Sequence, residues 1–202
     1  MIVCLGDSTT AGTPLFKSPL ESPPNGAGDE RSQFAYWLRQ AHPEWQVVNC
    51  GVNGERSDQI AERFDRDVWV PRARVVVIIA GVNDVYQGLP TAHVTDQLAG
   101  MYSLASACGI AVVAGTIVPY NTAGPDQNAR MHAINAWIQG YAVEHPGSVW
   151  FADTRLAAAD SRDIDRLSGS PDGLHPDIDG YRRMAEALQP AIEAALTNSV
   201  IR

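Results

Sequence analysis

Short β-branched runs alternate along this chain with longer segments of helical periodicity. Five runs are expected to be strands: Ile2-Leu5, Trp45-Asn49, Arg74-Ala80, Ile110-Thr116 and Val149-Ala152. The segments expected to be helices are Ser32-Ala41, Ser57-Val68, Val94-Cys108, Gln127-Val143 and Asp177-Leu196. Such alternation predicts a parallel sheet covered by helices on both faces. Arg74-Ala80 is almost entirely apolar, which is typical of a central strand buried on both faces.

Right-handed crossovers between such strands favour a three-layer α/β/α fold with a doubly wound, flavodoxin-like parallel sheet of about five strands. No repeat or linker divides the 202 residues, so residues 1-202 are expected to form a single domain. The segment Thr9-Arg31 is the exception to the alternation. It contains four prolines and three glycines and is too long for an ordinary connection between a strand and a helix. A loop that belongs to the functional site and an insertion without function are both possible, and we favour the first.

Composition excludes several classes of partner. The formal net charge of −8 and the absence of a basic cluster argue against nucleic-acid binding. The longest apolar run, Val75 to Val82, is too short to span a bilayer. The sequence opens on an apolar strand with no basic leader region, which predicts a cytoplasmic protein unless a leader has been removed. The three cysteines show no metal-binding spacing, and we expect no metal and no cofactor.

Four polar motifs follow predicted strands or precede the last predicted helix. They are Gly6-Asp7-Ser8-Thr9, Asn49-Cys50-Gly51-Val52-Asn53-Gly54, Gly81-Val82-Asn83-Asp84 and Asp172-Gly173-Leu174-His175-Pro176. The carboxyl ends of parallel strands lie at one edge of a sheet, and ligands bind there beside the switch in strand order. The first three motifs can therefore converge on one site.

The residue types in these motifs fit nucleophilic catalysis. A serine hydroxyl such as that of Ser8 needs a base to accept its proton, and histidine is suited to this near neutral pH. Asp172 precedes His175 by three residues, so both can reach one place, where the carboxylate would orient the imidazole. Donors for an oxyanion are available in the backbone N–H of Ser8, a turn N–H at Gly54 and the side-chain amide of Asn83.

Each motif alone has a simpler interpretation. Gly-Asp-Ser is common in turns and helix caps, and the glycines can serve turns with positive φ. Tyr120, after the fourth predicted strand, could line a pocket or belong to an ordinary turn. The order and placement of all four motifs together favour a catalytic site.

As a set, the four motifs resemble those of the SGNH hydrolases, also called GDSL esterases, over nearly the whole chain. That resemblance implies Ser8 as nucleophile, His175 as general base and Asp172 as its orienting partner. It also implies an oxyanion hole formed by Ser8, Gly54 and Asn83. Thr9 stands where the family often has leucine. The implied function is a serine esterase (a carboxylesterase) acting on a small-molecule ester, with short acyl chains favoured.

Other functions stay open at this level. Within the same family, the substrate could instead be an O-acetylated carbohydrate, a lysophospholipid or an acyl thioester. In another class, Ser8-Thr13 resembles the phosphate loop of a flavodoxin-type mononucleotide binder, which would leave Asn83 and His175 without a role. A degenerate SGNH domain that only binds is a further alternative. The oligomeric state cannot be derived from the sequence.

Overall fold

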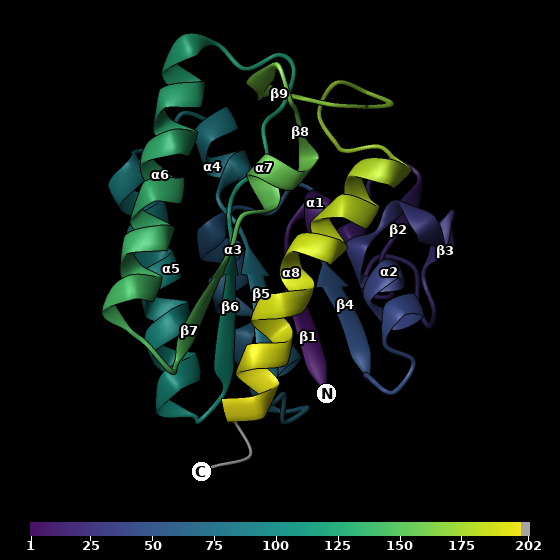
Figure 1. Ribbon diagram of the computed structural model, residues 1–202, viewed down its shortest axis with the longest axis vertical. Coiled ribbons are helices and arrows are strands. Elements are labelled where there is room, and N and C mark those ends of the chain that lie inside the picture. The colour runs from purple at the N-terminus through teal and green to yellow at the C-terminus, as the bar shows by residue number, and fades with distance from the viewer. Residues whose placement is uncertain (199–202) are drawn as a thin grey trace.

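A sheet of five parallel strands lies at the centre of the computed structural model, which describes residues 1–198 (Figure 1). Its strands are β1 (Ile2–Gly6), β4 (Val47–Gly51), β5 (Val75–Ile79), β6 (Ala111–Gly115) and β7 (Val149–Ala152). They are arranged in the order β4-β1-β5-β6-β7, and every neighbouring pair is parallel. This is the order of a flavodoxin-like doubly wound sheet, with the switch point between β1 and β5. The predicted fold class is confirmed.

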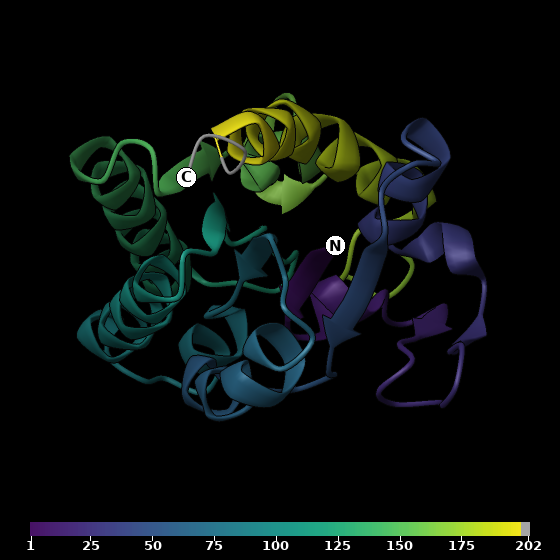
Figure 2. The same cartoon turned by 90° about the horizontal axis from the view of Figure 1, so that it is seen from below.

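Helices cover both faces of the sheet, as the view from below shows (Figure 2). One face carries α2 (Phe34–Ala41), α7 (Thr154–Ala158) and α8 (Ile178–Asn198). The other carries α3 (Ser57–Glu62), the π-helical turn η2 (Asp65–Trp69), α4 (Val82–Tyr86), α5 (Thr91–Ala107) and α6 (Pro125–Glu144). Among residues 1–198, no helix combines the length and apolar character needed to cross a membrane.

The two faces have separate apolar cores because neighbouring residues of a strand point to opposite sides. In β5, Val76 and Ile78 pack with α5 and α6, whereas Val75, Val77 and Ile79 pack with α2 and α8. All five are at most 3% exposed. Burial on both sides explains why this strand is apolar throughout.

The Thr9-Arg31 segment has more structure than the sequence indicates. It starts within α1 (Ser8–Ala11), continues through an antiparallel pair of short strands, β2 (Phe16–Lys17) and β3 (Ala27–Gly28), and ends in the 3-10 turn η1 (Glu30–Ser32). A second antiparallel pair, β8 (Ala159–Asp160) and β9 (Asp163–Leu167), follows α7. Neither pair was expected, because β2, β3 and β8 have only two residues each, and β9 is mostly exposed and contains no long apolar run.

The predicted strands and helices are all present, with shifted ends. The second predicted strand, Trp45-Asn49, lies two residues later in the structure, at β4. Helix α6 begins at Pro125 rather than Gln127, since proline is favoured in the first turn of a helix, before the apolar periodicity starts. The predicted helix Ser57-Val68 is divided into α3 and η2, and Arg63 lies between them.

Candidate active site

Ser8 is the first residue of a short helix that begins where β1 ends. Strand β1 finishes at Gly6, and Asp7 separates it from α1. Asp7 caps the helix, because its Oδ1 accepts a hydrogen bond from the backbone N–H of Thr9 at 2.9 Å. This sharp turn from strand to helix fixes the side chain of Ser8, which is only 4% exposed.

His175 and Asp172 reach Ser8 from the loop between β9 and α8. The Oγ of Ser8 lies 2.9 Å from Nε2 of His175, although 167 positions separate the two residues. The other ring nitrogen, Nδ1, lies 2.7 Å from Oδ2 of Asp172. A carboxylate at Nδ1 keeps a proton on that nitrogen, which leaves Nε2 free to accept the proton of the serine hydroxyl. The arrangement therefore suits general-base activation of Ser8.

Asp172 is held in its ionised form. Partial burial raises the pKa of Asp172, but hydrogen bonds from the side chain of His175 and from the backbone of Leu174 and His175 outweigh it and lower the pKa below its usual value. Both backbone N–H groups donate to Oδ1 at 2.9 Å. The carboxylate can therefore stabilise a protonated His175 during a reaction.

Three N–H groups around Ser8 are candidates for an oxyanion hole. Within residues 1–198, the backbone N–H groups of Ser8 and Gly54 donate no hydrogen bond. The amide of Asn83 donates one N–H to the carbonyl of Glu55 at 2.8 Å, which leaves its second N–H available. Ser8 and Asn83 line the same cavity, whereas Gly54 is exposed and adjoins Asn53, which lines it.

The two glycines of the second motif, Gly51 and Gly54, are required for different structural reasons. Gly54 has a φ of 81°, and no atom lies within 4 Å of the place of a Cβ, so its backbone conformation alone favours glycine. A Cβ at Gly51 would collide with the backbone of Ala11, so this glycine allows β4 to approach α1 closely. Asn49 joins the same two elements, because its Nδ2 donates to the carbonyl of Ala11 at 3.1 Å.

A small cavity opens over Ser8. Its volume is about 190 Å³, and it is lined by Ser8, Thr9, Asn53, Val82, Asn83, Tyr86, Tyr120, Leu174 and His175. Tyr120 was expected either to line a pocket or to belong to an ordinary turn, and in the structure it lines this cavity. Polar groups lie near the serine, while Val82, Tyr86 and Leu174 give the cavity an apolar wall.

The comparison with protein families decides the identity. The family model described as GDSL-like Lipase/Acylhydrolase family matches residues 4–183 of the chain. The chain belongs to this family. Acylhydrolase activity of the GDSL kind follows from that membership, and it implies an ester as substrate. None of the curated proteins matches the chain significantly.

Several solved structures share the fold of this chain. A GDSL-like lipase from Bacteroides thetaiotaomicron VPI-5482 is 24% identical with a TM-score of 0.73, over 95% of this chain and 87% of that one. A member of the lipolytic protein G-D-S-L family from Veillonella parvula DSM 2008 is 22% identical with a TM-score of 0.75, over 95% and 97% of the two chains. A catalytic mutant of an acetylxylan esterase from Geobacillus stearothermophilus is 19% identical with a TM-score of 0.73, over 95% and 93%.

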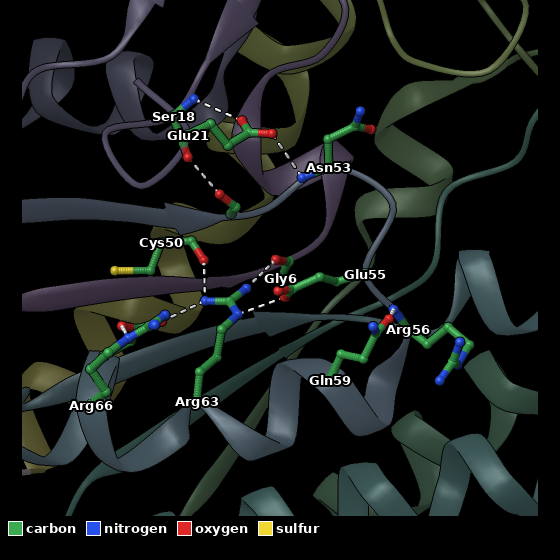
Figure 3. A network of polar contacts seen from close by, with 12 residues as sticks. Gly6, Ser18, Glu21, Cys50, Asn53, Glu55, Arg56, Gln59, Arg63 and Arg66 are labelled. Atoms are coloured by element: carbon green, nitrogen blue, oxygen red, sulfur yellow. Dashed lines mark hydrogen bonds and ion pairs between the residues drawn. The ribbon is translucent and has the colours of Figure 1, made fainter. Parts of the chain in front are cut away.

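The Thr9-Arg31 segment of this GDSL protein supports the site from outside rather than lining it. Apart from Thr9, none of its residues lines the cavity. Ser18 Oγ donates to the carbonyl of Gly51 at 2.6 Å, and the carboxylate of Glu21 accepts from the backbone N–H of Asn53 at 3.0 Å (Figure 3). The segment thus fixes the turn that carries Gly54. Of the hydroxyl-rich stretch Ser8-Thr13 compared with a phosphate loop, the first four residues form α1 and are buried, with Ser8, Thr9 and Thr10 each at most 4% exposed.

Two buried charged residues near the site were not predicted. Asp84 is fully buried and accepts hydrogen bonds from the backbone N–H and the Oγ of Ser57, at 2.9 and 2.7 Å. Arg63 is 7% exposed and contacts the ends of β1 and β4. The sequence carries one signal for Arg63: Arg63 and Asp67 are four residues apart beside the apolar positions of the predicted helix, where buried charges are usually paired.

One group of side chains has the composition of a metal site. The ligand atoms of Asp58, Asp84 and His93 lie within 4.8 Å of one another. Both oxygens of Asp84, however, already accept hydrogen bonds from Ser57. The Asp58 carboxylate is likewise paired with Arg56 at 2.9 Å. These partners satisfy the carboxylates without an ion.

Proposed function

We propose that this protein is a serine esterase that hydrolyses carboxylic esters with short acyl chains through an acyl-enzyme on Ser8. One observation carries the proposal: the hydrogen-bonded series from Ser8 to His175 to Asp172, with separations of 2.9 and 2.7 Å. A serine paired in this way with an oriented imidazole is the arrangement that acyl transfer requires.

The reaction would take place in two halves. Ser8 Oγ attacks the ester carbonyl while His175 Nε2 accepts its proton, and the Ser8 N–H, the Gly54 N–H and the Asn83 amide stabilise the oxyanion. His175 then gives the proton to the leaving alcohol, and the acyl group stays on Ser8. A water molecule, deprotonated by His175, hydrolyses this acyl-enzyme and restores the serine. Asp172 keeps its charge throughout and holds the imidazole in place.

The size of the cavity supports a short acyl chain. Pockets for drug-sized ligands measure roughly 300–1,000 Å³, and this cavity of about 190 Å³ is smaller. Removal of an acetyl group from a carbohydrate is the second candidate. It is favoured by the same small volume and by the fold shared with an acetylxylan esterase.

The proposal is tested with p-nitrophenyl acetate, butyrate and octanoate and with an acetylated xylo-oligosaccharide. Ser8→Ala and His175→Ala are each expected to lower kcat by about 10³-fold or more, as loss of a triad member does. His132→Ala is the matched control, because His132 is an exposed histidine paired with Asp165 at 2.7 Å. It is expected to keep the wild-type rate.

A folded wild-type protein without activity on any of these esters would refute the function. Full activity in Ser8→Ala would refute the mechanism. Faster turnover of octanoate than of acetate would contradict the preference for short chains.

A further inference from the structure

A buried guanidinium lies beneath the candidate oxyanion hole. Arg63 sits between α3 and η2, and its side chain is 7% exposed. Figure 3 shows it pointing upward from the helix to the strand ends, with dashed lines to several partners. No step of the proposed mechanism uses this residue, and it does not line the cavity.

Arg63 joins the carboxyl ends of two strands that carry site residues. Its Nη2 donates to the carbonyl of Gly6 at 2.7 Å, and its Nη1 donates to the carbonyl of Cys50 at 2.7 Å. Gly6 is the last residue of β1, two positions before Ser8, and Cys50 lies in β4, four positions before Gly54. One rigid planar cation therefore fixes the distance between the two strand ends from which the Ser8 and Gly54 turns begin.

A third contact connects Arg63 with Asn83. Its Nε donates to Oε2 of Glu55 at 2.6 Å, in an ion pair in which both side chains are largely buried. The backbone carbonyl of Glu55 accepts the amide of Asn83 at 2.8 Å. Glu55 directly follows Gly54, so the same residue positions the Gly54 turn and orients the Asn83 side chain.

The charge of Arg63 is balanced by carboxylates on both sides. Besides Glu55, Asp67 contacts Nη1 at 2.6 Å. Burial raises the pKa of Asp67, but hydrogen bonds from Arg66 and Arg63 outweigh this and keep the pKa below its usual value. Buried ion pairs are weak evidence for stability alone, and one of their attested uses is to specify a geometry. Here the geometry is that of three segments that meet at one site.

We propose that Arg63 is a positioning residue that holds the Ser8, Gly54 and Asn83 donors of the oxyanion hole in register. It acts through Gly6, Cys50 and Glu55 and does not touch the substrate. The inference rests on the proposed esterase function. Because a misplacement of about 1 Å can cost about 10²-fold in rate, loss of this clamp is expected to slow the chemistry more than it weakens substrate binding.

The test uses Arg63→Lys and, as matched control, Arg66→Met. Arg66 is paired with the same carboxylate, Asp67, at 2.6 Å, but it is exposed and contacts neither strand end. Arg63→Lys keeps a cation and loses the planar fork. We expect kcat for p-nitrophenyl acetate to fall about 10- to 100-fold with KM within about threefold. The affinity of Arg63→Lys for a boronic acid inhibitor, whose adduct with Ser8 mimics the tetrahedral intermediate, should fall by the same factor. Arg66→Met should keep the wild-type kcat, KM and inhibitor affinity.

Glu55→Gln provides a second variant if Arg63→Lys does not fold, because it removes the ion pair and retains the backbone carbonyl. It is expected to show a smaller loss of the same kind, about 3- to 10-fold in both kcat and boronate affinity. Unchanged kcat and boronate affinity together with a lowered melting temperature would overturn the inference and leave Arg63 a purely structural role. So would a raised KM at constant kcat.

These failures differ from failure of the proposed function itself. If the wild type hydrolyses esters and Ser8→Ala does not, the function stands and only the Arg63 inference is tested. If the wild type hydrolyses no ester, both fall.

Discussion

The two halves of the candidate site are built in different ways. The half that would move protons, Asp172 and His175, comes from a single loop. The half that would stabilise the oxyanion comes from the ends of β1, β4 and β5, which are distant in sequence and adjacent in the sheet. The proton-transfer half can be recognised from a sequence motif because its residues are neighbours in the chain. The oxyanion half depends on contacts between segments that are distant in sequence.

Short-range hydrogen bonds hold the proton-transfer half. Ser170 Oγ donates to the carbonyl of His175 at 2.6 Å and accepts from the N–H of Gly173 at 2.8 Å. The N–H groups of Leu174 and His175 bind Asp172. Longer contacts anchor the loop: the backbone N–H of Asn121 donates to the carbonyl of Gly173 at 2.7 Å, and the backbone N–H of Ser168 donates to the carbonyl of Ala158 at 3.0 Å.

Long-range contacts hold the oxyanion half. Arg63 connects β1, β4 and Glu55, and Glu21 of the Thr9-Arg31 segment binds Asn53 across 32 positions. Asp84, in α4 after β5, accepts hydrogen bonds from Ser57 at the start of α3. In the oxyanion half, substitutions in several separate segments should therefore change the catalytic rate. In the proton-transfer half, only substitutions within the loop itself should do so.

Among substitutions that leave Ser8, His175 and Asp172 intact, the largest effect is expected from Asn83→Ala. It removes one oxyanion donor, which typically costs about 10²- to 10³-fold in kcat, and it leaves the Glu55 carbonyl without its partner. Because the pair of Asp172 and His175 is untouched, the shape of the pH–rate profile should match that of the wild type. Initial rates on p-nitrophenyl acetate from pH 5 to 9 measure both quantities. Gln87→Ala, an exposed amide at the end of α4, should change neither.

A shifted pH profile in Asn83→Ala would mean that the two halves are coupled, and the comparison would then fail. A loss in kcat below about threefold would remove Asn83 from the oxyanion hole.

A smaller effect is expected from Ser170→Ala in the proton-transfer half. The substitution removes two short hydrogen bonds within the loop, each worth about 1 kcal/mol, and a longer contact of 3.4 Å with Oδ1 of Asp172. If the loss of these hydrogen bonds destabilises the transition state by about 1 kcal/mol, kcat falls about fivefold. The measurement is kcat together with the melting temperature. Ser161→Ala, an exposed serine in the turn between β8 and β9, is the control and should resemble the wild type. A loss comparable with that of Asn83→Ala would show that the loop is not self-contained.

The same contrast explains what the sequence could predict. Asp172 and His175 are three residues apart and bonded within one loop, so their spacing already contained the geometry. Strand β5 could be recognised because burial on both faces leaves a purely apolar run. The spacing of Arg63 and Asp67 could suggest an ion pair, but the contacts of Arg63 with the two strand ends could not be predicted, because those partners are backbone carbonyls, 57 and 13 positions away, which every residue type possesses. The support from Glu21 was hidden for a similar reason, since its partner is a backbone N–H.

The smallest effect on catalysis, and a distinct effect on stability, is expected from Asp7→Asn. Asp7 is 1% exposed, and its Oδ2 has no hydrogen-bond partner in the described part of the chain. Burial raises the pKa of Asp7 to about 7, because the hydrogen bond from Thr9 only partly offsets the loss of hydration and the charge of Asp84 adds to the increase. Asparagine keeps the Oδ1 cap of α1, so the rate should stay within a few-fold of the wild type.

The sign of the stability effect follows from linkage. Between pH 4 and pH 7 the unfolded chain has already released the Asp7 proton, while the folded protein still binds it. The free energy of unfolding of the wild type therefore falls as the pH rises through this range. The fall is at most ~1.4 kcal/mol for each unit by which the pKa of Asp7 in the folded protein exceeds its pKa in the unfolded chain. Asp7→Asn lacks this contribution, so the difference in stability between variant and wild type should shift in favour of the variant from pH 4 to pH 7. Urea denaturation at pH 4, 5.5 and 7 measures that difference. If the difference stays constant, Asp7 is already ionised in the folded protein. The oxyanion half would then tolerate two buried carboxylates, those of Asp7 and Asp84.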